Sequence, residues 1–106
     1  MKKINFSTEQ ISNEKRLLQK KIFYMLLIVD PETADQYPNT DVNKAFDDLF
    51  ADIDGINELL GYPVQIVNVA KKLAKAHNEY QSPDFKYKKY RKLVLDAGSE
   101  VEKIEV

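Results

Sequence analysis

The longest apolar run in the chain covers residues 22–29, which read Ile-Phe-Tyr-Met-Leu-Leu-Ile-Val and stop at Asp30-Pro31. On an α-helix with about 3.6 residues per turn, eight successive apolar positions cover every side of the helix instead of one stripe. The core of one small domain buries only one of those sides. The run therefore predicts a helix that packs partly inside its own domain and partly against another chain.

The first predicted helix leads into this run. Ser7 and Gln10 have the spacing of a capping box, which favours a helix start at Ser7. The helix should reach about Val29, because the residue before Pro31 is pushed out of the helical region. Its apolar face at helical spacing comprises Ile11, Leu18, Ile22, Met25, Leu26 and Val29.

The second predicted helix has the most regular amphipathic spacing in the chain. Asn39 or Thr40 can cap its start. Its apolar set is Val42, Phe46, Leu49, Phe50, Ile53, Ile56 and Leu60. Gly61 is a typical helix terminator and Pro63 a typical first residue of the next helix, so a tight corner should join the second and third helices.

Two further helices follow. The third presents Val64, Val67, Ala70, Leu73, Ala74 and Tyr80 at helical spacing, and the fourth presents Tyr90, Leu93, Val94, Ala97, Val101 and Ile104. Ser82-Pro83 should begin the fourth helix, and Gly98 should kink or end it, with Ser99 and Glu102 able to start a final turn. We therefore expect an all-α fold, a compact bundle of about four helices with short connections, as one domain over residues 1–106.

Length and composition narrow the class of protein. A chain of 106 residues without cysteine can build one core and cannot form disulfides or thiolate metal sites. The apolar run is too short to span a bilayer, which takes about 20 apolar residues, and the residues around it do not fit a signal peptide. We expect a cytoplasmic protein without membrane contact.

Charge is sorted along the chain although the net charge is only −1. Residues 1–29 carry six bases and two acids, 30–60 one base and nine acids, 61–92 eight bases and two acids, and 93–106 one base and four acids. Acidic and basic helices can pair within a chain or between copies of it. This pattern favours a homo-oligomer.

Catalytic and metal chemistry find little support in the sequence. Asp52, Asp54 and Gly55 have the spacing of part of an EF-hand loop, but Phe50 and Gly61 occupy the first and last positions, where carboxylates are required. His77, the single histidine, lies near the inward face of its helix, where a structural role is commoner than catalysis. We predict no catalytic residue, no metal site and no cofactor.

The segment Lys86 to Lys92 combines five bases with two tyrosines, directly after Phe85, and could bind nucleic acid through phosphates and stacked rings. A helix would turn Tyr90 toward the core, and the second helix offers a complementary acidic face. We therefore favour an acid–base contact within or between chains, and nucleic acid is the less favoured partner. The residues assigned to this charged interface are Asp48, Asp52, Lys88, Arg91 and Lys92.

The order of several short segments resembles a known family. These segments are Leu27 to Glu32, the acidic Phe46 to Leu49, Asn57 to Pro63 and Tyr90 to Gly98. Together they are similar to the small helical tail assembly chaperones of siphophages that infect Gram-positive bacteria. The resemblance implies a helical protein in the host cell cytoplasm that coats the hydrophobic, helical tape measure protein before the tail tube polymerises around it.

A chaperone of this kind needs exposed apolar surface and self-association. We expect Phe23, Tyr24, Leu27 and Ile28, on the side of the first helix away from its core face, to contact the tape measure protein or a neighbouring copy. Two other classes stay open. One is a nucleic-acid-binding protein that uses Lys86 to Lys92, and the other is a small immunity or inhibitor protein that binds one partner.

Overall fold

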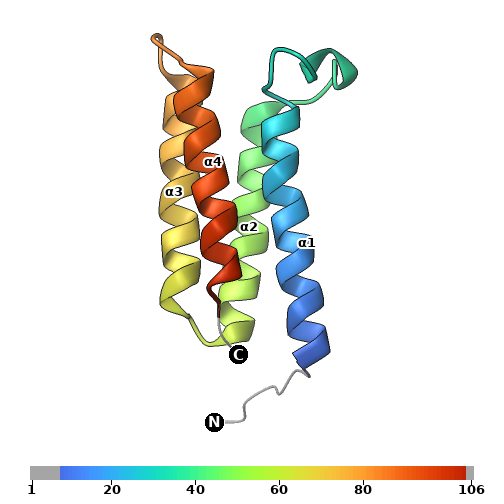
Figure 1. Ribbon diagram of the computed structural model, residues 1–106, viewed down its shortest axis with the longest axis vertical. Helices are drawn as coiled ribbons and strands as arrows, with labels where there is room; N and C mark the ends of the chain where they lie inside the picture. The colour runs from blue at the N-terminus through green and yellow to red at the C-terminus, as the bar shows by residue number, and fades with distance from the viewer. Residues whose placement is uncertain (1–7, 105–106) are drawn as a thin grey trace.

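The structure, a computed structural model, describes residues 8–104, which form an up-and-down bundle of four α-helices (Figure 1). The helices are α1 (Thr8–Leu27), α2 (Val42–Leu60), α3 (Val64–Gln81) and α4 (Tyr87–Glu102), and a short 3-10 helix, η1 (Ala34–Gln36), follows α1. The helices pack in the circular order α1, α2, α3, α4 and back to α1, with α3 and α4 in the closest contact. The prediction of an all-α bundle of about four helices is confirmed.

One apolar core runs along the bundle and takes side chains from every helix. Its largest fully buried members are Tyr90, Phe46, Leu18, Ile22, Met25, Ile53, Ile66 and Leu73. Tyr90 is 0% exposed, and its hydroxyl donates a hydrogen bond to the backbone oxygen of Met25 at 2.7 Å. This bond ties α4 to α1 and satisfies a polar group that burial would otherwise leave without a partner.

The end of α1 differs from the prediction. The helix ends at Leu27, not at about Val29. Asp30 N–H still donates to Leu26 O at 2.8 Å, and the Thr33 hydroxyl donates to Leu27 O at 2.7 Å, so the last turn is closed by the residues that follow it. This closure folds Ile28 inward, where it is only 5% exposed. The predicted start at Ser7 lies outside the described residues.

The cap of α2 is also different from the prediction. Asp41 is the N-cap residue, and its Oδ1 accepts a hydrogen bond from Lys44 N–H at 3.1 Å. The assignment to Asn39 or Thr40 is therefore wrong by one or two residues. At the other end Gly61 adopts the left-handed conformation with φ 79°, as expected for a terminating glycine.

The corners around α3 follow the predicted turns with small shifts. Pro63 is the N-cap and not the first residue of α3. Ser82 ends α3 instead of starting α4, which begins at Tyr87 after Lys86 N–H donates to Glu79 Oε2 at 2.9 Å. The helix α4 continues through Gly98 to Glu102, so Gly98 does not end it and Ser99 does not start a separate turn.

Candidate protein-binding groove

A shallow apolar groove runs between the antiparallel helices α1 and α4 and holds about 300 Å³. Ile22 and Leu26 from α1 and Val94 from α4 are buried at its floor. Its remaining lining residues are Gln19, Phe23, Leu95, Gly98, Ser99 and Glu102. We call it the α1–α4 groove. Figure 1 shows these two helices side by side along the bundle.

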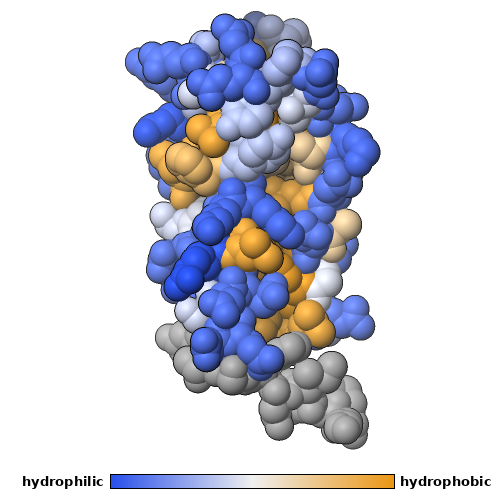
Figure 2. All heavy atoms as spheres, turned by 90° about the vertical axis from the view of Figure 1, so that its right-hand side faces the viewer, coloured by the Kyte–Doolittle hydropathy of each residue, from blue (hydrophilic) through white to orange (hydrophobic). Residues whose placement is uncertain are grey.

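Apolar side chains also form part of the rim of the α1–α4 groove. Phe23 on α1 is 54% exposed and Leu95 on α4 is 39% exposed, although both line the groove. A Cβ atom placed at Gly98 would meet nothing within 4 Å, so the backbone of α4 is open there. Figure 2 shows apolar patches between charged side chains on the α1 side of the bundle. The groove thus offers apolar surface and close access to a helix backbone.

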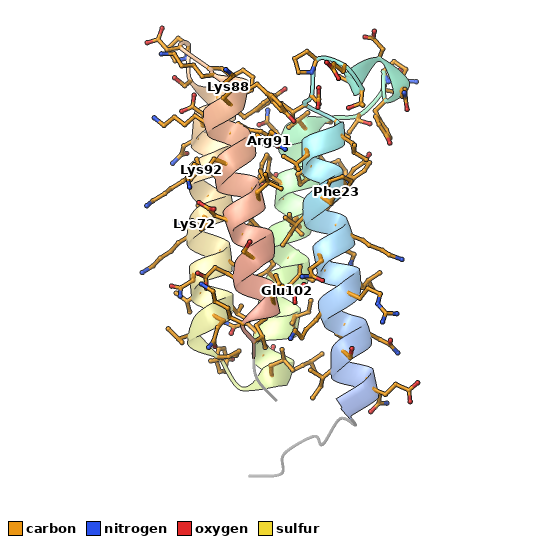
Figure 3. All side chains as sticks on the ribbon, viewed as in Figure 1. Phe23, Lys72, Lys88, Arg91, Lys92 and Glu102 are labelled. Atoms are coloured by element: carbon orange, nitrogen blue, oxygen red, sulfur yellow. The ribbon has the colours of Figure 1, made fainter. Side chains whose placement is uncertain are left out.

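One end of the groove is closed by polar groups. Gln19 Nε2 donates to Glu102 Oε1 at 2.7 Å, and it lies 3.5 Å from Gly98 O. Lys15 Nζ donates to the backbone oxygen of Glu102 at 3.3 Å, so a base stands beside the acid at this end. Beyond the other end Arg91 lies one turn before Leu95 on the same edge of α4, outside the groove lining. Figure 3 shows Arg91 in the upper part of α4 and Glu102 at its lower end.

The predicted partner-binding residues do not form one surface. Phe23 lines the α1–α4 groove, whereas Tyr24 lies on the other side of α1, where its ring meets that of Tyr37 edge-on at 5.6 Å. Leu27 is half-buried. The assignment of Ile28 is wrong, because Ile28 belongs to the core. Adjacent residues on a helix point about 100° apart, so Phe23 and Tyr24 reach different neighbours.

A second and larger groove, of about 550 Å³, lies between α1 and α2. Tyr24, Met25, Ala45 and Leu49 give it apolar walls. An ion pair crosses it, since Lys21 Nζ lies 2.8 Å from Asp52 Oδ2. Eight of its twelve lining residues are polar or charged, whereas six of the nine residues that line the α1–α4 groove are apolar or glycine. We therefore take the α1–α4 groove, although smaller, as the better candidate for protein binding.

The predicted charged interface is not assembled within the chain. Asp52 pairs with Lys21 of α1, and Asp48 pairs with Lys44 of its own helix at 3.0 Å. Lys92 likewise pairs with Asp96 at 3.1 Å. In the bundle α2 and α4 lie diagonally opposite, so the acids of α2 do not reach Lys88, Arg91 or Lys92 (Figure 3).

The aromatic rings in and next to the segment Lys86 to Lys92 already contact other parts of the chain. Tyr90 is in the core, and the Tyr87 hydroxyl donates to Asp30 Oδ2 at 3.2 Å. Burial, followed by the negative charge of Asp30, raises the pKa of Tyr87. The ring of Phe85 packs edge-on against Tyr80 at 5.8 Å. The bases remain exposed, but of the three rings only Phe85 is exposed, at 36%, so this described segment offers one ring for stacking and not a row of them.

His77 has the structural role that its position suggested. Its Nε2 lies 2.8 Å from Asn43 Oδ1, and its ring stacks on Phe46 at 4.4 Å between centroids. These contacts join α3 to α2. Within residues 8–104, no three histidine or carboxylate side chains cluster closely enough to hold a metal ion.

Sequence reasoning missed Gln19, Leu95, Gly98 and Glu102 as members of the groove. Leu95 was the detectable member, because it is a large apolar residue outside the core stripe of its helix. The others could be found only after α1 and α4 were known to be neighbours.

No protein-family model, curated protein or solved structure matches this chain. Among the described helices, none is both long enough and apolar enough to cross a membrane.

Proposed function

We propose that this protein is a non-enzymatic phage tail assembly chaperone whose α1–α4 groove binds a helical segment of the tape measure protein during tail morphogenesis in the host cytoplasm. The observation that supports this proposal best is the apolar groove with Phe23 and Leu95 exposed at its rim. Exposed apolar surface rimmed by polar residues is typical of protein-binding sites. The resemblance in segment order to siphophage tail assembly chaperones suggests the tape measure protein as the client.

The shape of the groove favours a helix as its occupant. Two antiparallel helices leave a furrow along their line of contact, and an amphipathic helix can lay its apolar face in such a furrow. Gly98 removes the side chain that would keep a third backbone at a distance. Arg91 and Glu102 are eleven residues apart on α4, or about 16 Å. A client helix with an acid near Arg91 would add a charge attraction at that end.

The chemistry of the groove also suits a long client with many binding segments. Apolar contacts are non-directional, so they tolerate different client side chains as long as one face stays apolar. Few of the lining groups impose hydrogen-bond geometry, since Gln19 and Glu102 already pair with each other. This tolerance is what coating an elongated helical protein requires.

The decisive experiment uses paired variants of the groove. Phe23→Asp and Leu95→Asp place a charge where the client should lie, and each should weaken capture of overlapping tape measure segments at least about tenfold. Leu59→Asp is the matched control, because Leu59 is similarly exposed at 46% but lies on α2 away from the groove. Helical content and the thermal midpoint are measured for all three variants.

Two results would contradict the proposal. Capture that is unchanged in folded Phe23→Asp and Leu95→Asp variants would remove the groove from client binding. Equal losses in the Leu59→Asp control would show that the effect is not specific to the groove. A tail tube gene upstream and a very long tape measure gene downstream would support the client assignment independently.

A further inference from the structure

The outer side of α2 carries a row of carboxylates. Asp47, Ala51, Asp54 and Glu58 follow one another at spacings of four, three and four residues, which places them in one line along the helix. All four are exposed, and the three acids form no ion pair within the described part of the chain. This acidic row of α2 carries three negative charges over about 16 Å.

Lysines of α3 lie along its seam with α4. Glu79 marks the side of α3 that faces α4, because its Oε1 lies 3.5 Å from Lys89 Nζ. Lys71, Lys72 and Lys75 precede Glu79 by eight, seven and four residues, so they lie in the rows of α3 that lead to it. None of these three lysines forms an ion pair with a residue that the structure describes.

The other side of this seam is basic as well. Lys92 follows Lys89 on α4 by three residues, and Lys88 lies four residues before Lys92. Figure 3 shows Lys88 and Lys92 on the same side of the bundle as Lys72 of α3. We call this surface the basic face, and it consists of Lys71, Lys72, Lys75, Lys88, Lys89 and Lys92.

The basic face keeps a surplus of positive charge. Its two carboxylates are Glu79, which pairs with Lys89, and Asp96, which pairs with Lys92 at 3.1 Å. Six bases and two acids give this face a net charge of +4. The acidic row and the basic face are therefore complementary in sign, and they lie on different helices of the same chain.

The two surfaces also agree in length. Because α3 and α4 are antiparallel and Glu79 is level with Lys89, Lys88 is level with about residue 80 of α3. The basic face thus extends about 14 Å along the bundle from Lys71 to Lys88, close to the about 16 Å of the acidic row. In the middle of that row Ala51 adds little height, and a small side chain lets another helix come close.

We propose that the acidic row of α2 in one copy of this chain binds the basic face of α3 and α4 in a second copy. The two surfaces point away from the bundle in different directions, since α2 and α4 lie diagonally opposite in it. A copy bound at one surface therefore leaves the other surface free. Such a head-to-tail contact repeats, so assembly continues beyond a dimer into a ring or a chain of copies.

The charge of the whole chain favours a second copy over nucleic acid as the partner of the basic face. Lysines also attract phosphates, but the net charge of −1 gives the chain no long-range attraction for a polyanion. A duplex bound to the basic face would also leave the acidic row without a partner. A second copy accounts for both surfaces with the charges of this chain alone.

This inference goes beyond the proposed function and does not depend on the client. No residue of the acidic row or of the basic face lines the α1–α4 groove. Client and neighbouring copies thus use separate surfaces. Exposed ion pairs contribute little singly and are screened by salt, so the assembly should be reversible and strongest at low ionic strength.

The test disables each surface in a separate variant. Asp54→Asn with Glu58→Gln neutralises most of the acidic row, and Lys72→Gln with Lys75→Gln neutralises the α3 side of the basic face. In sedimentation velocity at about 0.05 M ionic strength, the natural chain should form species larger than a dimer as its concentration rises. Each double variant alone should associate at least about tenfold more weakly.

An equimolar mixture of the two double variants is the decisive sample. Each variant keeps the surface that the other has lost, so the mixture should form a heterodimer and nothing larger. Arg16→Gln with Lys20→Gln is the matched control, because it removes two exposed bases from α1, away from both surfaces. This control should associate like the natural chain. Circular dichroism verifies the fold of every variant, and Asp47→Asn and Lys71→Gln replace any pair that unfolds.

Several results would overturn the inference. These are a natural chain that stays monomeric at the highest concentration, folded double variants that associate like the natural chain, and a mixture that stays monomeric or grows beyond a heterodimer. A monomeric natural chain that binds duplex DNA, and loses it with Lys72→Gln and Lys75→Gln, would assign the basic face to nucleic acid. Client capture separates the two proposals, since the lysine variant should keep capture and lose assembly, whereas Phe23→Asp should do the reverse.

Discussion

Tyr90 shows how one polar group can stabilise an apolar core. The side chain is fully buried, yet its hydroxyl donates a hydrogen bond to a backbone oxygen of α1, Met25 O, at 2.7 Å. Sequence pattern placed Tyr90 in the core correctly. It could not identify the acceptor, because that depends on the register of α4 against α1.

The pH dependence of stability tests this role of Tyr90. Burial raises the pKa of the hydroxyl, so the folded state holds the proton more tightly than the unfolded chain, where the pKa is near 10. This contribution is complete below about pH 10 and falls by about 1.4 kcal/mol per pH unit as the pH rises above that value. Tyr90→Phe should cost about 1 kcal/mol at about pH 8 through the lost hydrogen bond, and the gap should close by about pH 11. Urea unfolding of the natural chain and of Tyr90→Phe at both pH values measures this difference in stability. A difference that does not change with pH would contradict the role assigned to the Tyr90 hydroxyl.

At the scale of helices, the sequence predicted that the elements exist but not where each one starts. Apolar spacing predicted the four helices correctly. Gly61 ends α2 as expected, because that position has a positive φ, which glycine tolerates. Asn39, Thr40 and Asp41 are three consecutive good caps, and pattern alone cannot rank them. The choice falls on Asp41 because packing of Val42 and Phe46 sets where the first turn begins.

The cap of α2 can be checked by comparing two alanine variants. Asp41→Ala removes the acceptor of the Lys44 N–H bond and should lower the free energy of unfolding by about 1 kcal/mol. Asn39→Ala, two residues earlier and exposed, should change it by less than about 0.5 kcal/mol. Chemical denaturation of both variants measures their free energies of unfolding. Equal losses in the two variants would mean that Asp41 is not the residue that caps α2.

At the scale of the whole molecule, the sequence predicted surplus apolar surface and placed part of it wrongly. The run from Ile22 to Val29 does supply more apolar surface than the core takes, yet Ile28 is in the core and Tyr24 faces α2. Only Phe23 joins the α1–α4 groove, and its counterpart Leu95 comes from a helix far away in the sequence.

The apolar face predicted for the third helix is also wrong in part, because Val64, Val67 and Ala74 are exposed. The buried face of α3 is formed instead by Ile66, Val69, Leu73 and Ala76. Several apolar positions on α3 allowed more than one face, and a groove depends in addition on which helices become neighbours.

Salt should leave client binding unchanged or strengthen it, because the α1–α4 groove binds its client through apolar contact. Raising ionic strength from about 0.05 M to about 1 M shortens the screening length from more than 10 Å to about 3 Å. Attraction between exposed charges then weakens, while capture of a client segment by Phe23 and Leu95 should hold or strengthen. Fluorescence anisotropy of a labelled tape measure segment measures this binding at both salt concentrations. Client binding that collapses with salt would instead place the client on the exposed bases of α4, such as Lys88 and Arg91, and away from the groove.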